Sequence, residues 1–343
     1  MNDGLSQFRD AMRAAGLEPP DAIEPGRLHR FPGIGKRNGN TAGWCKLFED
    51  GLGGCFGDWS SDFTENWQAK REKPFSQSER AAFMRRVEET WKRVDAERQQ
   101  QYADAAEKAA AIWNAAIPAN DDHPYLVQKG IKANGARLHK DALIIPVRSG
   151  GELLSLQFIA KDGGKRFLSG GRITGGYFSI GTIKGAEALC IAEGFATGAT
   201  VHQATGYPVA VAFNAGNLEA VAKAMRDRLP NLQMIICADD DAGTEGNPGV
   251  TKANLAALAT GAKVAIPAFG DQRPDGATDF NDLARLRGPE SVREAIAAAG
   301  NTDPLRRLPD SCKRAQAGAR QLALGWLARR GKASCIGRRS RHG

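Results

Sequence analysis

Four acidic side chains attract attention first, because each follows a short apolar run and together they could support metal-dependent chemistry. Glu193 follows one run, and the consecutive acids Asp239, Asp240 and Asp241 follow another. Side chains alternate along an extended chain, so Asp239 and Asp241 are predicted to share one face and Asp240 the other. Carboxylates brought together repel unless a cation neutralises them, and hard oxygen ligands favour Mg²⁺ or Mn²⁺. The sequence therefore predicts a metal site at these acids.

Each acid also has an ordinary structural explanation. A carboxylate at Glu193 suits the positive end of a helix dipole whether or not it does chemistry, and three acids in a row can form a solvated loop. A further group, Asp279-Phe-Asn-Asp282, can add metal ligands at Asp279 and Asp282 or can simply cap a helix. The residues alone leave these alternatives open.

A series of alternating strands and helices is expected to position these acids. From about residue 184, apolar runs suited to strands alternate with stretches suited to helices, a pattern that predicts a parallel sheet with right-handed crossovers. The apolar runs are residues 188–192, 208–213, 233–238 and 262–266. Chemistry in such sheets takes place at the carboxyl ends of the strands, where Glu193 and the three acids stand.

A basic segment precedes this acidic one. Residues 126–172 hold nine Lys and Arg against three acids, whereas residues 184–303 hold ten against fifteen. Gly-Gly turns separate three short apolar stretches between residues 142 and 168, which predicts an antiparallel meander. Lys165, Arg166 and Arg172 are candidate contacts for phosphate groups, although ordinary surface charge also explains them.

The rest of the chain divides by composition. Residues 1–68 are predicted to form a small β-rich module, and residues 76–117 a helical linker that starts at a capping box of Ser76 and Glu79. Residues 119–183 form the basic segment and residues 184–301 the α/β domain. The tail, residues 302–343, is predicted to be disordered and has eleven Lys and Arg against one acid from Pro304 onward. It could bind DNA without specificity, or it could be an accidental terminus.

Composition and missing motifs exclude several classes of protein. No apolar run reaches the ~18 residues needed to cross a bilayer, so we expect a soluble, cytoplasmic protein with no membrane partner. The six cysteines never form a CxxC pair, which argues against a zinc finger, and no phosphate-binding GxxxxGK[ST] loop is present.

The motifs Glu193-Gly, Asp239-x-Asp241 and Asp279-Phe-Asn-Asp282 follow successive predicted strands, and their order resembles a Toprim domain over about residues 184–300. This is the metal-dependent α/β fold of bacterial-type primases, topoisomerases and some nucleases. Further stretches resemble DNA primases of phages and plasmids, the mobile-element type. These stretches are residues 26–31, 54–59, 123–131, 143–151 and 165–168. The zinc-ribbon cysteines of many such enzymes are absent from this sequence, and we expect no attached helicase.

The resemblance implies a DNA primase that makes short oligonucleotide primers on single-stranded DNA by metal-dependent nucleotidyl transfer. Glu193 would act in acid–base catalysis or as a metal ligand, and Asp239 and Asp241 would bind Mg²⁺ or Mn²⁺. The implied partners are a single-stranded DNA template, nucleoside triphosphates and a separate replicative helicase. Two alternatives remain: a Toprim nuclease, or a non-catalytic Toprim protein that binds single-stranded DNA or recruits a replisome.

Overall fold

The computed structural model describes residues 3–37, 39–61, 63–71, 75–270 and 273–300 of the 343-residue chain. The basic tail predicted at residues 302–343 lies outside the described residues. The chain forms two compact units, Met1–Gln100 and Gln101–Gly343. The boundary between them falls inside one long helix, α2 (Gln77–Ala115).

The first unit contains an antiparallel sheet, a helix that precedes it and the first part of α2, so it extends beyond the module predicted at residues 1–68. Helix α1 (Asp3–Ala14) is followed by a four-stranded antiparallel sheet in the order β1-β2-β3-β4. The strands are β1 (His29–Phe31), β2 (Gly43–Leu47), β3 (Gly53–Asp58) and β4 (Phe63–Gln68). Phe8 of α1 packs on one face of this sheet, and Val87 and Val94 of α2 pack on the other.

Helix α2 begins and ends where its sequence signals predict. The Ser76 backbone N–H donates to the Glu79 carboxylate at 2.7 Å, and the Glu79 N–H donates to the Ser76 hydroxyl at 3.3 Å. This reciprocal pair satisfies two N–H groups that the first helical turn leaves without partners. The helix ends at Ala115, shortly before Pro118.

The second unit starts with the antiparallel meander, a five-stranded sheet in the order β5-β6-β7-β8-β9. Its elements are β5 (Ile117–Pro118), α3 (Pro124–Lys129), β6 (Arg137–His139), β7 (Ala142–Ser149), β8 (Glu152–Ile159) and β9 (Lys165–Phe167). Alternate side chains enter different cores: Leu143 and Ile145 pack toward the second sheet, whereas Ile144 and Phe158 pack with Ala109 of α2.

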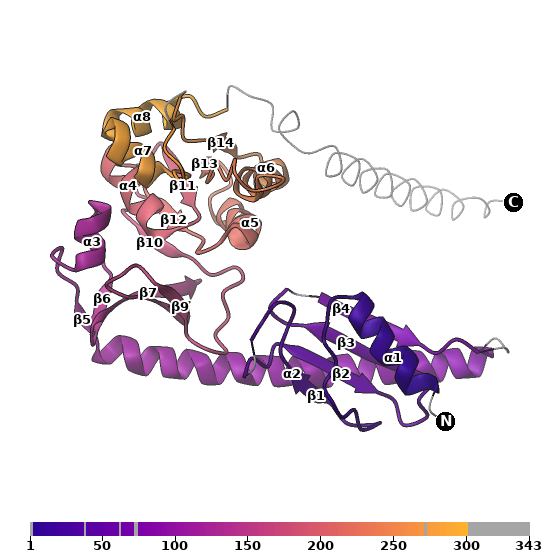
Figure 1. The fold of residues 1–343 in the computed structure, drawn as a ribbon. Helices are drawn as coiled ribbons and strands as arrows, with labels where there is room; N and C mark the ends of the chain where they lie inside the picture. The colour runs from indigo at the N-terminus through magenta and orange to yellow at the C-terminus, as the bar shows by residue number, and fades with distance from the viewer. Residues whose placement is uncertain (1–2, 38, 62, 72–74, 271–272, 301–343) are drawn as a thin grey trace, which may run out of the picture. The chain divides into compact units, whose positions relative to one another are not determined.

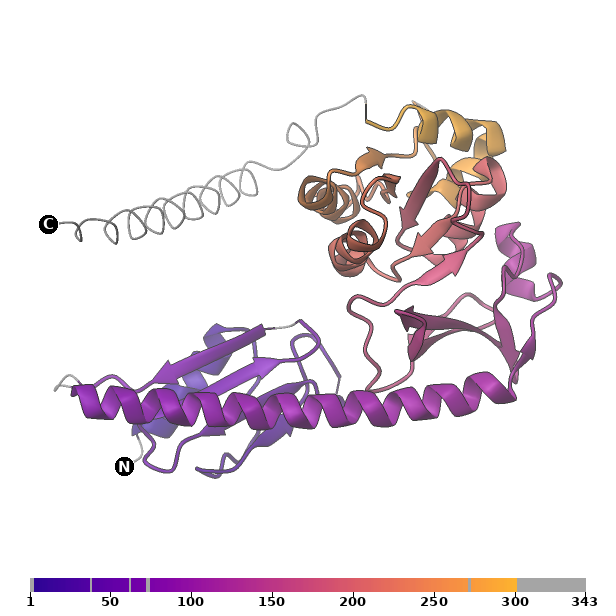
Figure 2. The same ribbon diagram turned by 180° about the vertical axis from the view of Figure 1, so that it is seen from behind.

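The predicted parallel sheet follows, in the order β10-β12-β11-β13-β14. Its strands are β10 (Phe178–Ile180), β11 (Ala188–Ala192), β12 (Val209–Val211), β13 (Gln233–Cys237) and β14 (Lys263–Ala265). The helices are α4 (Phe195–Thr205), α5 (Leu218–Arg228), α6 (Pro248–Thr260), α7 (Phe280–Arg287) and α8 (Pro289–Ala297). Helices α5 and α6 cover one face, and α4, α7 and α8 cover the other (Figures 1 and 2).

Two features of this sheet matter for the site. The four strands β11 to β14 are parallel, so their carboxyl ends meet at one edge, as the sequence predicts. The edge strand β10 is antiparallel to β12 and precedes the boundary expected at residue 184. Among the residues that the structure describes, no helix combines the length and the apolar character that a membrane span requires.

Candidate active site

Neighbouring strands bring the predicted acids together. Strands β11 and β13 pair in parallel with Ala192 opposite Cys237. Glu193 is the first residue after β11 and Asp239 the second after β13, so both leave the sheet side by side at its carboxyl edge. The Asp240 backbone N–H donates to the Thr278 carbonyl at 2.8 Å, which brings the start of α7 and its Asp279 to the same edge.

The raised pKa values in this acidic cluster show that its negative charge is not balanced. Burial raises the pKa of Asp239 to about 8, and the nearby charges of Glu193, Asp279 and Asp241 add to the rise. Burial and Asp241 also raise the pKa of Glu193. The Oδ1 atom of Asp239 is buried and, among the described residues, has no hydrogen-bond partner. The cluster therefore concentrates negative charge with too little positive charge to balance it.

Asp240 has a different environment from its two neighbours. Its Oδ2 accepts a hydrogen bond from an Arg273 N–H at 2.6 Å, and its Oδ1 accepts one from the Asn247 amide at 2.6 Å. Asp240 thus faces away from the cluster, as the alternation of faces predicts. Sequence reasoning missed Arg273, because this basic partner lies 33 residues downstream.

The acidic group at the start of α7 caps that helix, which is one of the two roles that the sequence allowed for it. The Asp279 carboxylate caps α7 by accepting the Asp282 N–H at 2.9 Å, accepts the Thr197 hydroxyl at 3.0 Å, and still raises the pKa of Asp239. The Asp282 carboxylate completes a capping box and accepts the Thr278 N–H at 3.0 Å. Metal binding by either residue remains a prediction, and the contacts of Asp282 favour capping.

A turn after β12 supports Glu193 from the side. The Ala215 backbone N–H donates to the Glu193 carboxylate and opposes the rise in its pKa. Phe213, two residues earlier, has a φ of 71°, a left-handed conformation that is costly for a bulky side chain. The turn is therefore held in a strained shape at the place where it contacts a candidate catalytic group.

One buried amide ties this turn to the loop that follows the meander. The Asn217 Nδ2 donates to the carbonyls of Ile173, Gly176 and Ala212 at 3.2, 2.9 and 2.8 Å. Its Oδ1 accepts the Gly175 N–H at 2.8 Å. Asn217 is fully enclosed, so these bonds fix the loop against the end of β12. No sequence signal singled out Asn217, because three of its four partners lie about 40 residues upstream.

The three predicted basic residues do not act together. Lys165 lies close enough to the cluster that its charge lowers the pKa of both Glu193 and Asp239. Arg166, the next residue on β9, stacks its guanidinium 4.2 Å above the Phe158 ring on the other face of the meander. Arg172 donates to the Thr174 carbonyl at 3.1 Å in the following loop. Of the three, Lys165 is the one whose charge acts on the acids.

The chemistry of the cluster suits a hard divalent cation. Its donors are carboxylate oxygens, and the unpartnered Oδ1 of Asp239 is the kind of buried atom that a cation would satisfy. Within the described ranges, no three His, Cys, Asp or Glu side chains are already arranged as ligands of one ion.

Comparison with known proteins identifies the domain that carries the acids. Residues 188–290 match the family model of the Toprim domain. It is similar to two Escherichia coli proteins named DNA primase TraC. One is 32% identical over 312 residues, covering 85% of this chain and 21% of the relative. The other is 31% identical over 285 residues, covering 77% and 26%. The chain thus spans about a quarter or less of the length of these relatives.

Two solved structures are also similar. One is a DNA primase domain from Pseudomonas aeruginosa, 16% identical with a TM-score of 0.35, covering 48% of this chain and 54% of that one. The other is the Aquifex aeolicus primase with its zinc-binding and RNA polymerase domains, 11% identical with a TM-score of 0.38, covering 88% and 86%.

Proposed function

We propose that this chain is a DNA primase of the phage and plasmid type, which synthesises short oligonucleotides on single-stranded DNA by metal-dependent nucleotidyl transfer. The observation that carries the proposal is the acidic cluster of Glu193, Asp239 and Asp241 at the carboxyl edge of a Toprim sheet, with Lys165 beside it. The similarity to DNA primase TraC over most of the chain supports the same activity.

The residues suit distinct parts of this reaction. Asp239, Asp241 and Glu193, with Asp279 as a further candidate, would hold Mg²⁺ or Mn²⁺, which when bound supplies positive charge against the triphosphate of the incoming nucleotide. Glu193 has a raised pKa and is oriented by the Ala215 N–H, so it is suited to accept the proton of the attacking hydroxyl. Lys165 would contact the triphosphate.

The substrates follow from the same proposal. Nucleoside triphosphates would enter between Lys165 and the acids, and a single-stranded DNA template would pair with them. A separate replicative helicase would supply that single strand during phage or plasmid replication.

A single assay separates primer synthesis from the alternative functions. The full chain is incubated with a single-stranded DNA template, labelled ribonucleotides and Mg²⁺, and in a parallel reaction the DNA carries the label instead. Primase activity predicts new short oligonucleotides and intact template. Shortened DNA without nucleotide incorporation would support a Toprim nuclease. Template binding with neither product would support a non-catalytic single-strand-binding protein.

A further inference from the structure

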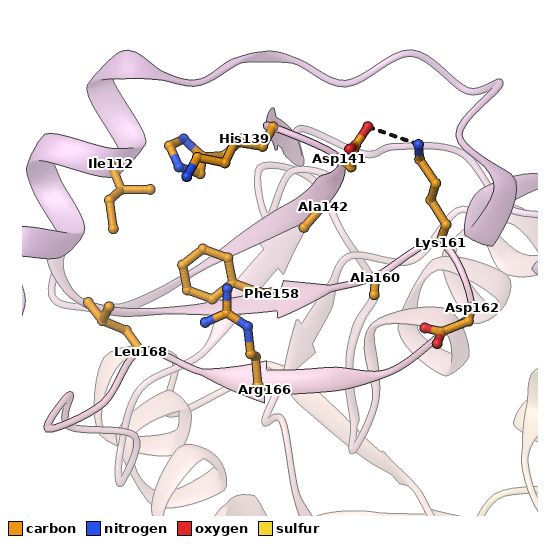
Figure 3. A pocket seen from close by; sticks show the side chains of 11 residues that line it. Ile112, His139, Asp141, Ala142, Phe158, Ala160, Lys161, Asp162, Arg166 and Leu168 are labelled. Atoms are coloured by element: carbon orange, nitrogen blue, oxygen red, sulfur yellow. Dashed lines mark hydrogen bonds and ion pairs between the residues drawn. The ribbon is translucent and has the colours of Figure 1, made fainter.

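A cavity lies on the face of the meander that points away from the acidic cluster. Its volume is about 640 Å³, and strands β6 to β9 and Ile112 of α2 surround it (Figure 3). Apolar side chains form its floor, and charged or polar ones its rim. The floor is made by Ile112, Ala142, Phe158, Ala160 and Leu168, and the rim by His139, Lys140, Asp141, Lys161, Asp162 and Arg166.

Strand alternation places this cavity and the acids on opposite faces. Lys165 pairs with Ile159, which packs in the core shared with the parallel sheet. Arg166 pairs with Phe158, which packs in the core on the α2 side. The two neighbouring cations of β9 therefore serve different faces. Whatever Lys165 contacts beside the acids, Arg166 is available to a different ligand or to a different part of the same one.

The stacked pair of Arg166 and Phe158 is a platform for a planar group. The guanidinium lies 4.2 Å from the centre of the ring (Figure 3), and the Arg166 side chain is exposed. One face of the Arg166 guanidinium lies on the Phe158 ring, and the opposite face does not contact this ring. Planar guanidinium groups stack on nucleic-acid bases, and such stacking tolerates any base sequence. The apolar floor beside the platform suits the rest of the base.

The charges on the rim favour a polyanion. Lys161 pairs with Asp141 at 2.8 Å, but both side chains are largely exposed, so the pair contributes little stability and can be exchanged for a phosphate. Asp162 accepts the Gly164 N–H at 2.9 Å and so has a partner within its own turn. Lys140 projects from the tight turn between β6 and β7, where its φ is 56°.

The spacing of the cations distinguishes a strand from a free nucleotide. Lys140, Lys161 and Arg166 come from three separate places: the turn after β6, the turn after β8 and the middle of β9. A single triphosphate is best held by cations that converge on it, whereas successive phosphates of a strand are met by cations spread along its path.

We propose that this cavity binds a segment of single-stranded DNA, with one base stacked on the Arg166 guanidinium and the flanking phosphates held by Lys140 and Lys161. The choice of DNA rests on the proposed primase function. Binding itself needs neither metal nor catalysis, so the two proposals can fail separately.

Fluorescence anisotropy with a labelled single-stranded oligonucleotide, in EDTA, tests the site on the full chain. Arg166→Ala should weaken binding about fivefold to tenfold through lost stacking and charge. Arg166→Lys should restore only part of that affinity, because lysine keeps the positive charge but lacks the planar guanidinium group that stacks on a base. Lys140→Ala should lower the slope of log affinity against log salt by about one. The matched control is Lys132→Ala, an exposed lysine of the same basic segment outside the cavity.

Two results would overturn the proposal. One is an affinity of Arg166→Ala and Lys140→Ala equal to that of the wild type. The other is a loss of nucleoside triphosphate binding in Arg166→Ala while oligonucleotide binding stays intact. An independent readout avoids substitutions altogether: a photoreactive 5-iodouracil oligonucleotide should crosslink to peptides covering residues 139–142 or 158–168. Crosslinks confined to other peptides would contradict the site.

Discussion

Lys165 of β9 lies close enough to Asp239, the second residue after β13, to lower the pKa of its carboxyl, although the two residues belong to different sheets. The meander therefore supplies a cation to the acidic edge of the Toprim sheet. One cation does not balance the cluster, since burial and three neighbouring carboxylates still raise the Asp239 pKa to about 8. The acids therefore keep an excess of negative charge, which should affect both the stability of the protein and its binding of metal.

Asp239→Asn should stabilise the metal-free protein, and increasingly so as the pH rises. The folded-state pKa of Asp239 is about 8, against an ordinary value of 3.8. Protonation therefore favours the folded state, and the stability that it contributes is complete below about pH 4 and lost as the pH rises through 8. The variant avoids this loss and should gain about 1–3 kcal/mol near pH 8. Urea unfolding in EDTA at several pH values measures it.

The control for this prediction is added Mg²⁺. A bound cation should stabilise the wild-type protein and leave Asp239→Asn nearly unchanged, because binding to the folded state alone shifts the unfolding equilibrium. Equal unfolding free energies for the two proteins across the pH range, with and without Mg²⁺, would show that ionised Asp239 does not destabilise the folded protein.

Glu193→Gln should slow the chemical step and spare template binding. Glutamine keeps the shape of the side chain and can still accept the Ala215 N–H, but it cannot take a proton. A general base contributes about 10²–10⁴-fold to a rate, so kcat for primer synthesis should fall within that range. Single-turnover kinetics and oligonucleotide binding measure the two quantities. A parallel loss of template affinity would assign Glu193 a structural role instead.

Lys165→Ala and Arg166→Ala should have different effects, even though the residues are adjacent. Lys165 acts on the acidic cluster, so its loss should raise the KM for nucleoside triphosphates about tenfold or less with little change in DNA affinity. Arg166 lies on the other face of the meander, so Arg166→Ala should weaken DNA binding with little change in the KM for nucleoside triphosphates. Steady-state kinetics and anisotropy, run on both variants, check the split. Identical profiles for the two variants would be incompatible with it.

Asn217→Ala should destabilise the second unit. The substitution leaves the carbonyls of Ile173, Gly176 and Ala212 and the Gly175 N–H without their buried partner. Loss of such a network costs about 2–4 kcal/mol, and thermal unfolding measures it. Asn214→Ala in the same turn, which removes a single side-chain bond to the Asn217 N–H, is the matched control and should cost less. Equal costs would mean that the loop is held by other contacts.

The sequence predicts the parallel sheet well because its signals are local. The run before Glu193 was expected at residues 188–192, and β11 occupies those residues. The capping box at Ser76 and the Gly-Gly turns of the meander also act over a few residues. Helix α1 was not predicted, although its sequence places Phe8 and Met12 one turn apart on the face that meets the sheet.

The missed parts of the site depend on long-range contacts. Arg273 reaches Asp240 across 33 residues, and Asn217 reaches the 173–176 loop across more than 40. No local pattern indicates such pairs. The different faces of Lys165 and Arg166 could have been inferred from the sequence, because the alternation that separates Asp240 from Asp239 and Asp241 also separates two neighbours on β9.

The most direct test of the metal-dependent primase compares primer synthesis by the full chain with that of Asp239→Ala and Asp241→Ala, each with Mg²⁺ and with EDTA. The wild type should make short template-dependent oligonucleotides with Mg²⁺ and none with EDTA. Each variant should lose at least about 100-fold in rate, and Asp239→Ala should unfold at or above the wild-type temperature, because its loss relieves the metal-free cluster of a buried repelling charge. Synthesis by the wild type in EDTA, or undiminished synthesis by both variants, would contradict the account.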